Sequence, residues 1–147
     1  MKAVIQRVRR ARVEVGGETL ASIGAGMLVL VGVEQGDGDS EVAYFAEKIP
    51  RLRIFDDAAG RMNLSLEEIG GEILLVSQFT LAGCLEKGRR PSFIDAETPE
   101  RARVLYESLA EQLRGAGARV QTGRFQEMMQ VELVNDGPVT FLLERRG

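Results

Sequence analysis

Histidine is absent from the 147-residue chain. A serine or cysteine nucleophile that relies on an imidazole base is therefore excluded, and so is a zinc site built on histidine nitrogens. The single cysteine, Cys84, can form neither an internal disulfide nor a site made of several thiolates. If the protein hydrolyses a substrate, a group other than imidazole must move the proton.

Long hydrophobic segments and a strong net charge are also missing. The apolar run within residues 26–33 is too short to span a bilayer, and the first residues lack the apolar core of a signal peptide. The formal net charge is only −3, so nucleic acid would have to bind through local basic patches. With only one cysteine as well, these features predict a cytoplasmic protein that has no contact with a membrane.

The hydrophobic share of 44% and the charged share of 28% are those of an ordinary globular protein. We expect a single domain over residues 1–147, because the length suits one core and no linker or repeat interrupts the chain. The apolar patterns predict an α/β fold with a mostly antiparallel, barrel-like sheet. Strands are expected over residues 3–15, 19–24, 26–33, 52–55, 72–81, 119–123, 128–134 and 139–144.

Two helices are expected to cover this sheet. The first lies over about residues 41–50, with Asp39 or Ser40 as its cap. The second lies over about residues 99–114, where Thr98 is the cap and a proline takes the first helical position. Each has apolar residues at the 3–4 spacing of one buried face, so each should pack on the sheet through that face.

Several familiar motifs are incomplete. Residues 83–90 have the glycine spacing of a phosphate loop but lack its Lys-Ser/Thr pair. Residues 37–48 begin like a calcium loop but lack the glycine and the final glutamate that such a loop needs. The adjacent carboxylates at positions 56–57 and 67–68 lie in turn-like, polar surroundings and are expected to face solvent. No metal site or cofactor is therefore expected.

Two polar stretches stand out against their apolar surroundings. The stretch "VSQFTL" places Ser77, Gln78 and Thr80 where a buried strand ends, and buried polar groups need hydrogen-bond partners. The stretch "NDGPVT" sets a Gly-Pro step, Gly137–Pro138, between two apolar runs, although proline cannot donate to a strand ladder. Taken singly, the first fits a strand end with satisfied hydroxyls and the second fits a hairpin turn.

Together with "GRRPSF" between them, these stretches occur in an order and at distances that resemble the D-aminoacyl-tRNA deacylase family. Further agreement lies in "QRV", "IGAGMLVLVGV", "RMNLS" and "TGRF", so the resemblance covers essentially the whole chain. Members of this family hydrolyse the ester that joins a D-amino acid to tRNA, and they also remove glycine from a non-cognate tRNA. The resemblance implies a homodimeric hydrolase that uses no cofactor.

The resemblance also implies a chiral filter made of backbone. In relatives the Gly-Pro peptide bond is cis and reaches into the active site of the partner subunit. Gly137 and Pro138 would then accept hydrogen bonds from the α-ammonium group of the substrate and occupy the volume that an L side chain needs. Arg7 and Asn135 are expected to support this segment.

The same resemblance implies that Ser77, Gln78, Phe79 and Thr80 form the catalytic stretch. Backbone N–H groups around Gln78, Phe79 and Thr80 would stabilise the oxyanion that develops on the ester. Thr80 is the obvious nucleophile candidate, but without histidine its hydroxyl has no evident base. We therefore expect the 2′-hydroxyl of the tRNA to assist hydrolysis, while Ser77 and Gln78 position groups and Phe79 shapes the pocket.

The remaining assignments concern the tRNA itself. Phe125 and Met129 are expected walls for the terminal adenine, with core filling as the alternative. Candidate phosphate contacts are Arg89, Arg90 and the segment of residues 7–12, although each of these charges also fits a solvated surface.

Some positions depart from the family pattern, and two other functions stay open. The departing positions, which bear on the contacts to adenosine and not on the reaction, are Gln126, Glu127 and Met128. One alternative is a non-catalytic module that binds RNA or nucleotides. The other is an ester hydrolase for small D-aminoacyl compounds.

Overall fold

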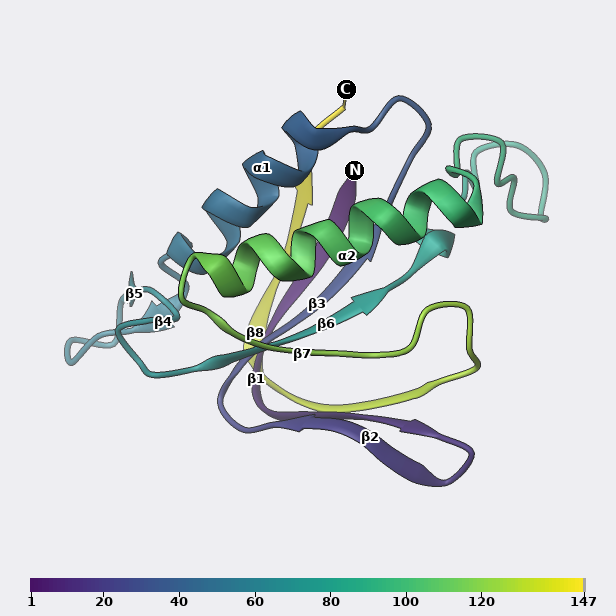
Figure 1. Ribbon diagram of the computed structural model, residues 1–147. Coiled ribbons are helices and arrows are strands. Elements are labelled where there is room, and N and C mark those ends of the chain that lie inside the picture. The colour runs from purple at the N-terminus through teal and green to yellow at the C-terminus, as the bar shows by residue number, and fades with distance from the viewer. Residues whose placement is uncertain (147) are drawn as a thin grey trace.

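Strand β1 (Lys2–Val15) is the centre of a bent, six-stranded sheet in the computed structural model, which describes residues 1–146 (Figure 1). Its first half pairs with β3 (Gly26–Gly32) and its second half with β2 (Glu18–Ile23), while β8 (Gln130–Glu144) follows it along nearly its whole length. These three pairings are antiparallel. β6 (Glu72–Ser77) adds to β3, and β7 (Arg119–Thr122) adds to β6, both in parallel.

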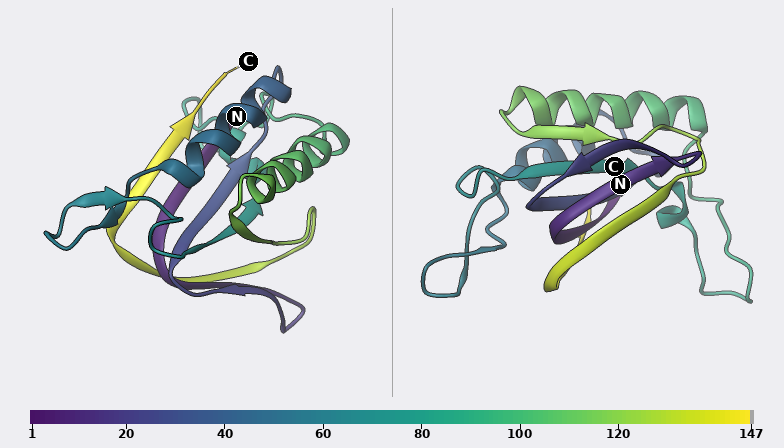
Figure 2. Two further views of the ribbon diagram at one scale, coloured as in Figure 1. Left: turned by 60° about the vertical axis from the view of Figure 1, so that its left-hand side comes forward. Right: turned by 90° about the horizontal axis from the view of Figure 1, so that it is seen from below.

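Two helices cover one face of the sheet, α1 (Asp39–Lys48) and α2 (Pro99–Gly115), and they pack against each other (Figures 1 and 2). Short 3-10 turns follow α1 and β6, at Ile49–Arg51 and Phe79–Ala82. A small hairpin of β4 (Phe55–Asp56) and β5 (Met62–Leu64) projects from one end of the molecule. The predicted α/β fold, with a mostly antiparallel, nearly closed sheet and two helices, is confirmed.

The bend of the sheet creates two hydrophobic cores. The main core fills the space between the helices and the sheet and includes Ile5, Val29, Leu75 and Leu109. A second core lies on the opposite face, where β2 and the distal half of β1 curl over residues such as Val76. Because successive residues of a strand point to opposite faces, a continuous apolar run such as β3 feeds both cores at once.

The N-terminus of α1 differs from the prediction. The cap is Gly38, not Asp39 or Ser40, and helix residues begin at Asp39. The Glu41 carboxylate accepts hydrogen bonds from the Ser40 hydroxyl at 2.8 Å and from the Gly38 N–H at 2.7 Å. These bonds hold the pKa of Glu41 below its ordinary value. A glutamate in the first turn therefore does the capping that the sequence suggested for a shorter side chain.

The Gly-Pro stretch does not form a hairpin turn, so that interpretation was wrong. β8 runs through it as one strand, with Gln6 opposite Thr140 and Val8 opposite Asn135. Residues 136–139 therefore bulge out opposite the single residue Arg7. The peptide bond between Gly137 and Pro138 is cis, as the family resemblance implied.

The strand predicted over residues 72–81 is also shorter than expected. β6 ends at Ser77, and Phe79–Ala82 form the 3-10 turn. The strand predicted over residues 52–55 is reduced to β4, which starts at Phe55. Within residues 1–146, neither α1 nor α2 combines the length and the apolarity that a membrane span requires.

Candidate active site

A cavity of about 510 Å³ opens where β6 ends, and it gathers five of the twelve predicted site residues. These are Ser77, Gln78, Phe79, Phe125 and Met129. The other lining residues lie in β6, just after β3, before and within the start of α2, and in β8 and the loop before it: Val33, Val76, Glu97, Pro99, Ala102, Gln126, Glu127, Met128 and Val131. The cavity lining is thus mainly apolar, with polar groups at the end of β6, before α2 and in the loop before β8.

The end of β6 is held in place by backbone contacts. The Gln78 N–H donates to the Val31 carbonyl at 2.7 Å, which continues the pairing of β6 with β3 one residue beyond Ser77. The 3-10 turn then reverses the direction of the chain, and the Leu81 N–H donates to the Gln78 carbonyl at 3.1 Å. Ser77, at the end of β6, and Gln78, directly after it, therefore line the cavity from a buried strand, and Phe79 lines it from a tight turn.

The backbone N–H groups around this turn differ in whether they are free to donate a hydrogen bond to a ligand. Because the Gln78 N–H is bonded to Val31, it is not free to stabilise an oxyanion, contrary to the prediction. Phe79 and Thr80 occupy the first positions of the 3-10 turn, where N–H groups have no acceptor within the turn. Their two N–H groups are the ones that remain for a ligand.

Thr80 lies beside the cavity without lining it. Its exposed hydroxyl oxygen accepts a hydrogen bond from the Gln78 side-chain amide at 2.6 Å. An amide N–H is a donor and cannot take a proton from the hydroxyl, so this contact does not activate Thr80 as a nucleophile.

Phe125, which also lines the cavity, packs against α2. Its ring lies 6.1 Å from the ring of Tyr106 and 5.6 Å from the Arg103 guanidinium, both on α2. Burial raises the pKa of the Tyr106 hydroxyl, which donates to the Leu75 carbonyl at 2.8 Å. Phe125 and Met129 are half-buried, so each contributes to a core and still presents a surface to the cavity.

The Gly137–Pro138 step lies outside this cavity of its own chain. Both residues are exposed, but the segment is fixed from the protein side. The Arg7 guanidinium, which is buried, donates to the Asp136 carbonyl at 2.9 Å and to the Ile54 carbonyl at 2.9 Å. The Asn135 side-chain amide donates to the carbonyls of Arg7 at 2.9 Å and Val139 at 3.0 Å.

Two acidic residues line the cavity, of which the sequence analysis named Glu127 as a departure from the family pattern and did not single out Glu97. Glu97, whose side chain is 10% exposed, accepts from the Arg101 guanidinium at 3.0 Å and from the Thr98 N–H at 2.9 Å. Glu127 lies 3.6 Å from Arg124. The approach of Glu97 to β6 depends on how the loop before α2 packs, and no local pattern signals it. Within residues 1–146, no group of side chains suits a metal ion.

The predicted phosphate contacts lie away from the cavity. Arg89 and Arg90 are exposed in the loop that follows the 3-10 turn. Asp56, which the sequence analysis expected to face solvent, also forms an ion pair with Arg7 at 3.1 Å.

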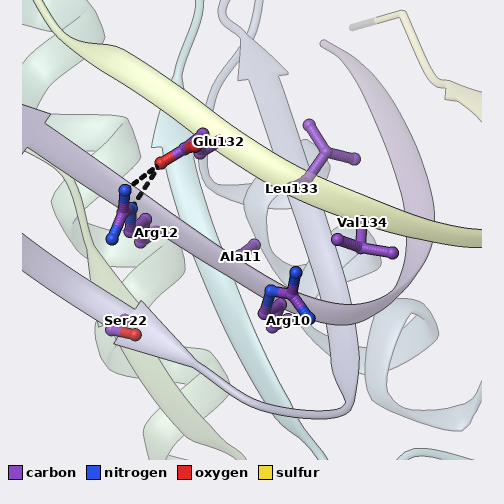
Figure 3. A pocket seen from close by; sticks show the side chains of 7 residues that line it. All are labelled: Arg10, Ala11, Arg12, Ser22, Glu132, Leu133 and Val134. Atoms are coloured by element: carbon purple, nitrogen blue, oxygen red, sulfur yellow. Dashed lines mark hydrogen bonds and ion pairs between the residues drawn. The ribbon is translucent and has the colours of Figure 1, made fainter.

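A separate hollow of about 340 Å³ lies over β1, β2 and β8 (Figure 3). In it, Arg12 is paired with Glu132, and Arg10 projects alongside. The positive charge of Arg12 is therefore largely neutralised by Glu132.

Residues 4–144 match the family described as D-Tyr-tRNA(Tyr) deacylase. A D-aminoacyl-tRNA deacylase from Syntrophotalea carbinolica is 57% identical over 144 residues, covering 98% of this chain and 97% of the relative. One from Geobacter sulfurreducens is 56% identical over 147 residues, covering 100% and 97%.

Two solved structures are similar over nearly the whole chain. The structure named "c-Myc DNA Unwinding Element Binding Protein" has a TM-score of 0.94 at 44% identity and covers 100% of both chains. A second, named "Structural Analysis of a probable eukaryotic D-amino acid tRNA deacylase", has a TM-score of 0.85 at 18% identity and covers 97% of both chains, which shows a shared fold.

Proposed function

The chain belongs to the D-Tyr-tRNA(Tyr) deacylase family, and from this premise we propose that it hydrolyses the ester bond between a D-amino acid and tRNA. The products are the free D-amino acid and tRNA, and the reaction proofreads chirality. The observation that carries the proposal is the cavity at the end of β6, which Ser77, Gln78 and Phe79 line together with Phe125 and Met129. An activity on charged tRNA belongs in the cytoplasm, where we expect the protein to act.

The cavity supplies the parts that such a reaction needs. The flat ring of Phe125 and the thioether of Met129 suit the terminal adenine. The N–H groups of Phe79 and Thr80 would stabilise the negative charge on the ester oxygen, an effect worth about 3–4 kcal/mol per donor in studied hydrolases. Ser77 and Gln78 would position the sugar and the ester at the mouth.

We attribute the proton transfer to the substrate. The chain contains no histidine, and the Thr80 hydroxyl is bonded to an amide donor and not to a base. The 2′-hydroxyl of the terminal ribose lies next to the 3′-ester in aminoacyl-tRNA, so it can assist the attack of water. Replacing the terminal adenosine by 2′-deoxyadenosine should then lower kcat strongly while the KM stays within a few-fold.

Stereoselectivity would come from a second copy of the chain. The exposed Gly137–Pro138 step is braced by Arg7 and Asn135 and does not reach its own cavity. In a homodimer it would enter the cavity of the partner, accept hydrogen bonds from the α-ammonium group and block the direction of an L side chain. Glycine has no side chain to reject, so glycyl-tRNA should also be hydrolysed.

The test is deacylation of matched D-aminoacyl-, L-aminoacyl- and glycyl-tRNA by the purified protein. We expect the D-ester and the glycyl ester to be hydrolysed and the L-ester to persist at its spontaneous rate. Binding without turnover would instead favour a nucleic-acid-binding module, an alternative to which the name of the 44% identical structure draws attention. Equal turnover of a small D-amino acid ester without tRNA would favour a general ester hydrolase.

A further inference from the structure

A loop between β6 and α2 carries exposed groups that the proposed reaction does not use. It projects from the end of the molecule opposite the β4–β5 hairpin (Figures 1 and 2). Cys84 and Ser92 exchange two backbone hydrogen bonds, at 2.7 and 2.9 Å, and so close the base of the loop. We call residues 85–91 the basic loop, because Lys87, Arg89 and Arg90 are all exposed on it.

Aromatic surface connects this loop to the cavity. Phe93 follows the basic loop, and its ring lies 5.3 Å from the ring of Phe79, with the two planes inclined by 54°. Phe79 is 59% exposed and Phe93 is 38% exposed. Gly83 lies under Phe93, where a Cβ would come within 2.9 Å of the ring. Because Phe79 also lines the cavity, Phe79 and Phe93 form an aromatic platform that continues outward from it.

The charges of the basic loop are free to meet a ligand. Within residues 1–146, Lys87, Arg89 and Arg90 form no ion pair with an acidic residue. Arg51 and Arg103, by comparison, each pair with a glutamate four residues away along the chain. Aromatic rings beside unpaired cations are the combination that single-stranded nucleic acid binds, through base stacking and phosphate contacts.

We propose that this surface binds the unpaired nucleotide that precedes the terminal adenosine of tRNA. Its base stacks on the aromatic platform at Phe93, and the phosphates on either side of it contact Arg89 and Arg90. The inference rests on the proposed function, because the terminal adenosine must occupy the cavity for its neighbour to reach Phe93. A second copy of the chain fits this surface less well, because a symmetric contact would bring two sets of cations together.

Two substrates of different length test the proposal. One is D-aminoacyl-tRNA, and the other is 3′-O-D-aminoacyl-adenosine, which lacks the preceding nucleotide and its phosphates. For Phe93→Leu we expect kcat/KM on the tRNA to fall about tenfold, the order of losing one stacked base, with the adenosine ester unaffected. Phe93→Tyr keeps the ring and should retain wild-type values on both substrates. An equal loss on both substrates would overturn the proposal, since Phe93 would then act by supporting Phe79.

The charged part is tested by salt dependence. For the double variant Arg89→Gln/Arg90→Gln, the slope of log affinity against log salt should fall by about 1.4 for tRNA, from about 0.7 per single-strand phosphate contact. Arg61→Gln is the matched control, because Arg61 is an exposed arginine between β4 and β5 at the opposite end of the molecule. An unchanged slope in the double variant, or an equal change in the control, would contradict the proposal.

A binding measurement separates this inference from the proposed function. The trinucleotide CCA should bind the wild-type protein more tightly than adenosine does, and Phe93→Leu should reduce that difference about tenfold, the order of one lost stacked base. This result would support the platform even if the wild-type protein hydrolysed neither ester, an outcome that would count against the proposed function alone. If Phe93→Leu instead converts a dimer into a monomer in light scattering, the platform is a subunit contact and the proposal is wrong.

Discussion

Arg7 and Asn135 hold the Gly137–Pro138 step from the side that faces the protein. The Arg7 guanidinium bonds to the carbonyls of Ile54 and Asp136 at once, and a lysine has no second donor in a rigid fork to replace it. The Asn135 amide ties both ends of the bulge to β1 and β8. An exposed segment thereby acquires a fixed shape, which a steric filter requires.

At Gly137 the tolerance for a side chain is small. A Cβ there would lie 2.3 Å from the Asn135 Oδ1 atom. We expect Gly137→Ala to displace the Asn135 amide and leave two carbonyls without their donor, lowering the free energy of unfolding by about 1–3 kcal/mol. D-aminoacyl-tRNA deacylation should fall as well. Urea denaturation and the deacylation assay measure the two effects.

The control is Gly24→Ala, because a Cβ at Gly24 meets no atom within 4 Å. This variant should match the wild type in both assays. If Gly137→Ala were as stable and as active as Gly24→Ala, the bracing by Asn135 would have no functional part.

The variant Thr80→Ala tests whether hydrolysis is assisted by the 2′-hydroxyl of the substrate and not by the hydroxyl of Thr80. Its hydroxyl accepts from Gln78 and does not line the cavity, so Thr80→Ala should keep kcat within about tenfold of the wild type, as expected when only a neutral hydrogen bond is lost. Single-turnover deacylation measures this. A trapped acyl-enzyme in the wild type, together with loss of activity in a folded, substrate-binding Thr80→Ala protein, would identify Thr80 as the nucleophile.

Among the elements, α2 supports the cavity wall through Tyr106. Removing the Tyr106 hydroxyl leaves the Leu75 carbonyl bonded to the Gly123 N–H at 3.2 Å, so Tyr106→Phe should cost only about 1 kcal/mol of stability. Tyr106→Ala should cost about 3–5 kcal/mol and raise the KM, because Phe125 loses the ring behind it. Urea denaturation and steady-state kinetics distinguish the two variants. An equal rise of the KM in both would contradict the claim that the ring of Tyr106 supports Phe125.

The elements also show what a sequence can and cannot predict. The apolar stripe and the Thr98-Pro99 start located α2, and alternation located β1, because both signals depend on local periodicity. The interpretation of the Asp-Gly-Pro stretch as a hairpin turn was wrong, because the bulge that it forms exists only in the pairing of β8 with β1. The strand predicted beyond Ser77 ends early, because the chain enters the 3-10 turn of Phe79–Ala82 there.

The candidate site was predictable in part for the same reason. The residues Ser77, Gln78 and Phe79 follow one another in the sequence, so a family motif identifies them together. Their meeting with Phe125 and Met129 followed from the resemblance, and the geometry agrees with it. Glu97 was not foreseen, because it reaches the cavity only through the packing of the loop before α2.

For the whole molecule, the Gly137–Pro138 step lies outside its own cavity, and the proposed function therefore requires a site shared by two copies. Mixing two defective proteins tests this. One carries Gly137→Ala, and the other carries Phe125→Ala/Met129→Ala, so a hybrid dimer has one site with both parts intact. Equal mixing after dissociation should restore roughly a quarter of wild-type activity, because half of the dimers are hybrids with one such site. Recovery no greater than the average of the two parents would show that each site is built from one chain.

The pairing of β1 with β8 joins residues 2–15 to residues 130–144. The first strand therefore cannot complete its hydrogen bonding until the last strand has been synthesised. During synthesis, the edge of β1 that β8 will cover stays open until nearly the entire chain has left the ribosome. Such an unpaired edge is a template for association with other nascent chains. Chaperone demand and yield should therefore depend most on how fast the C-terminal strand is delivered, more than on the stability of the finished fold.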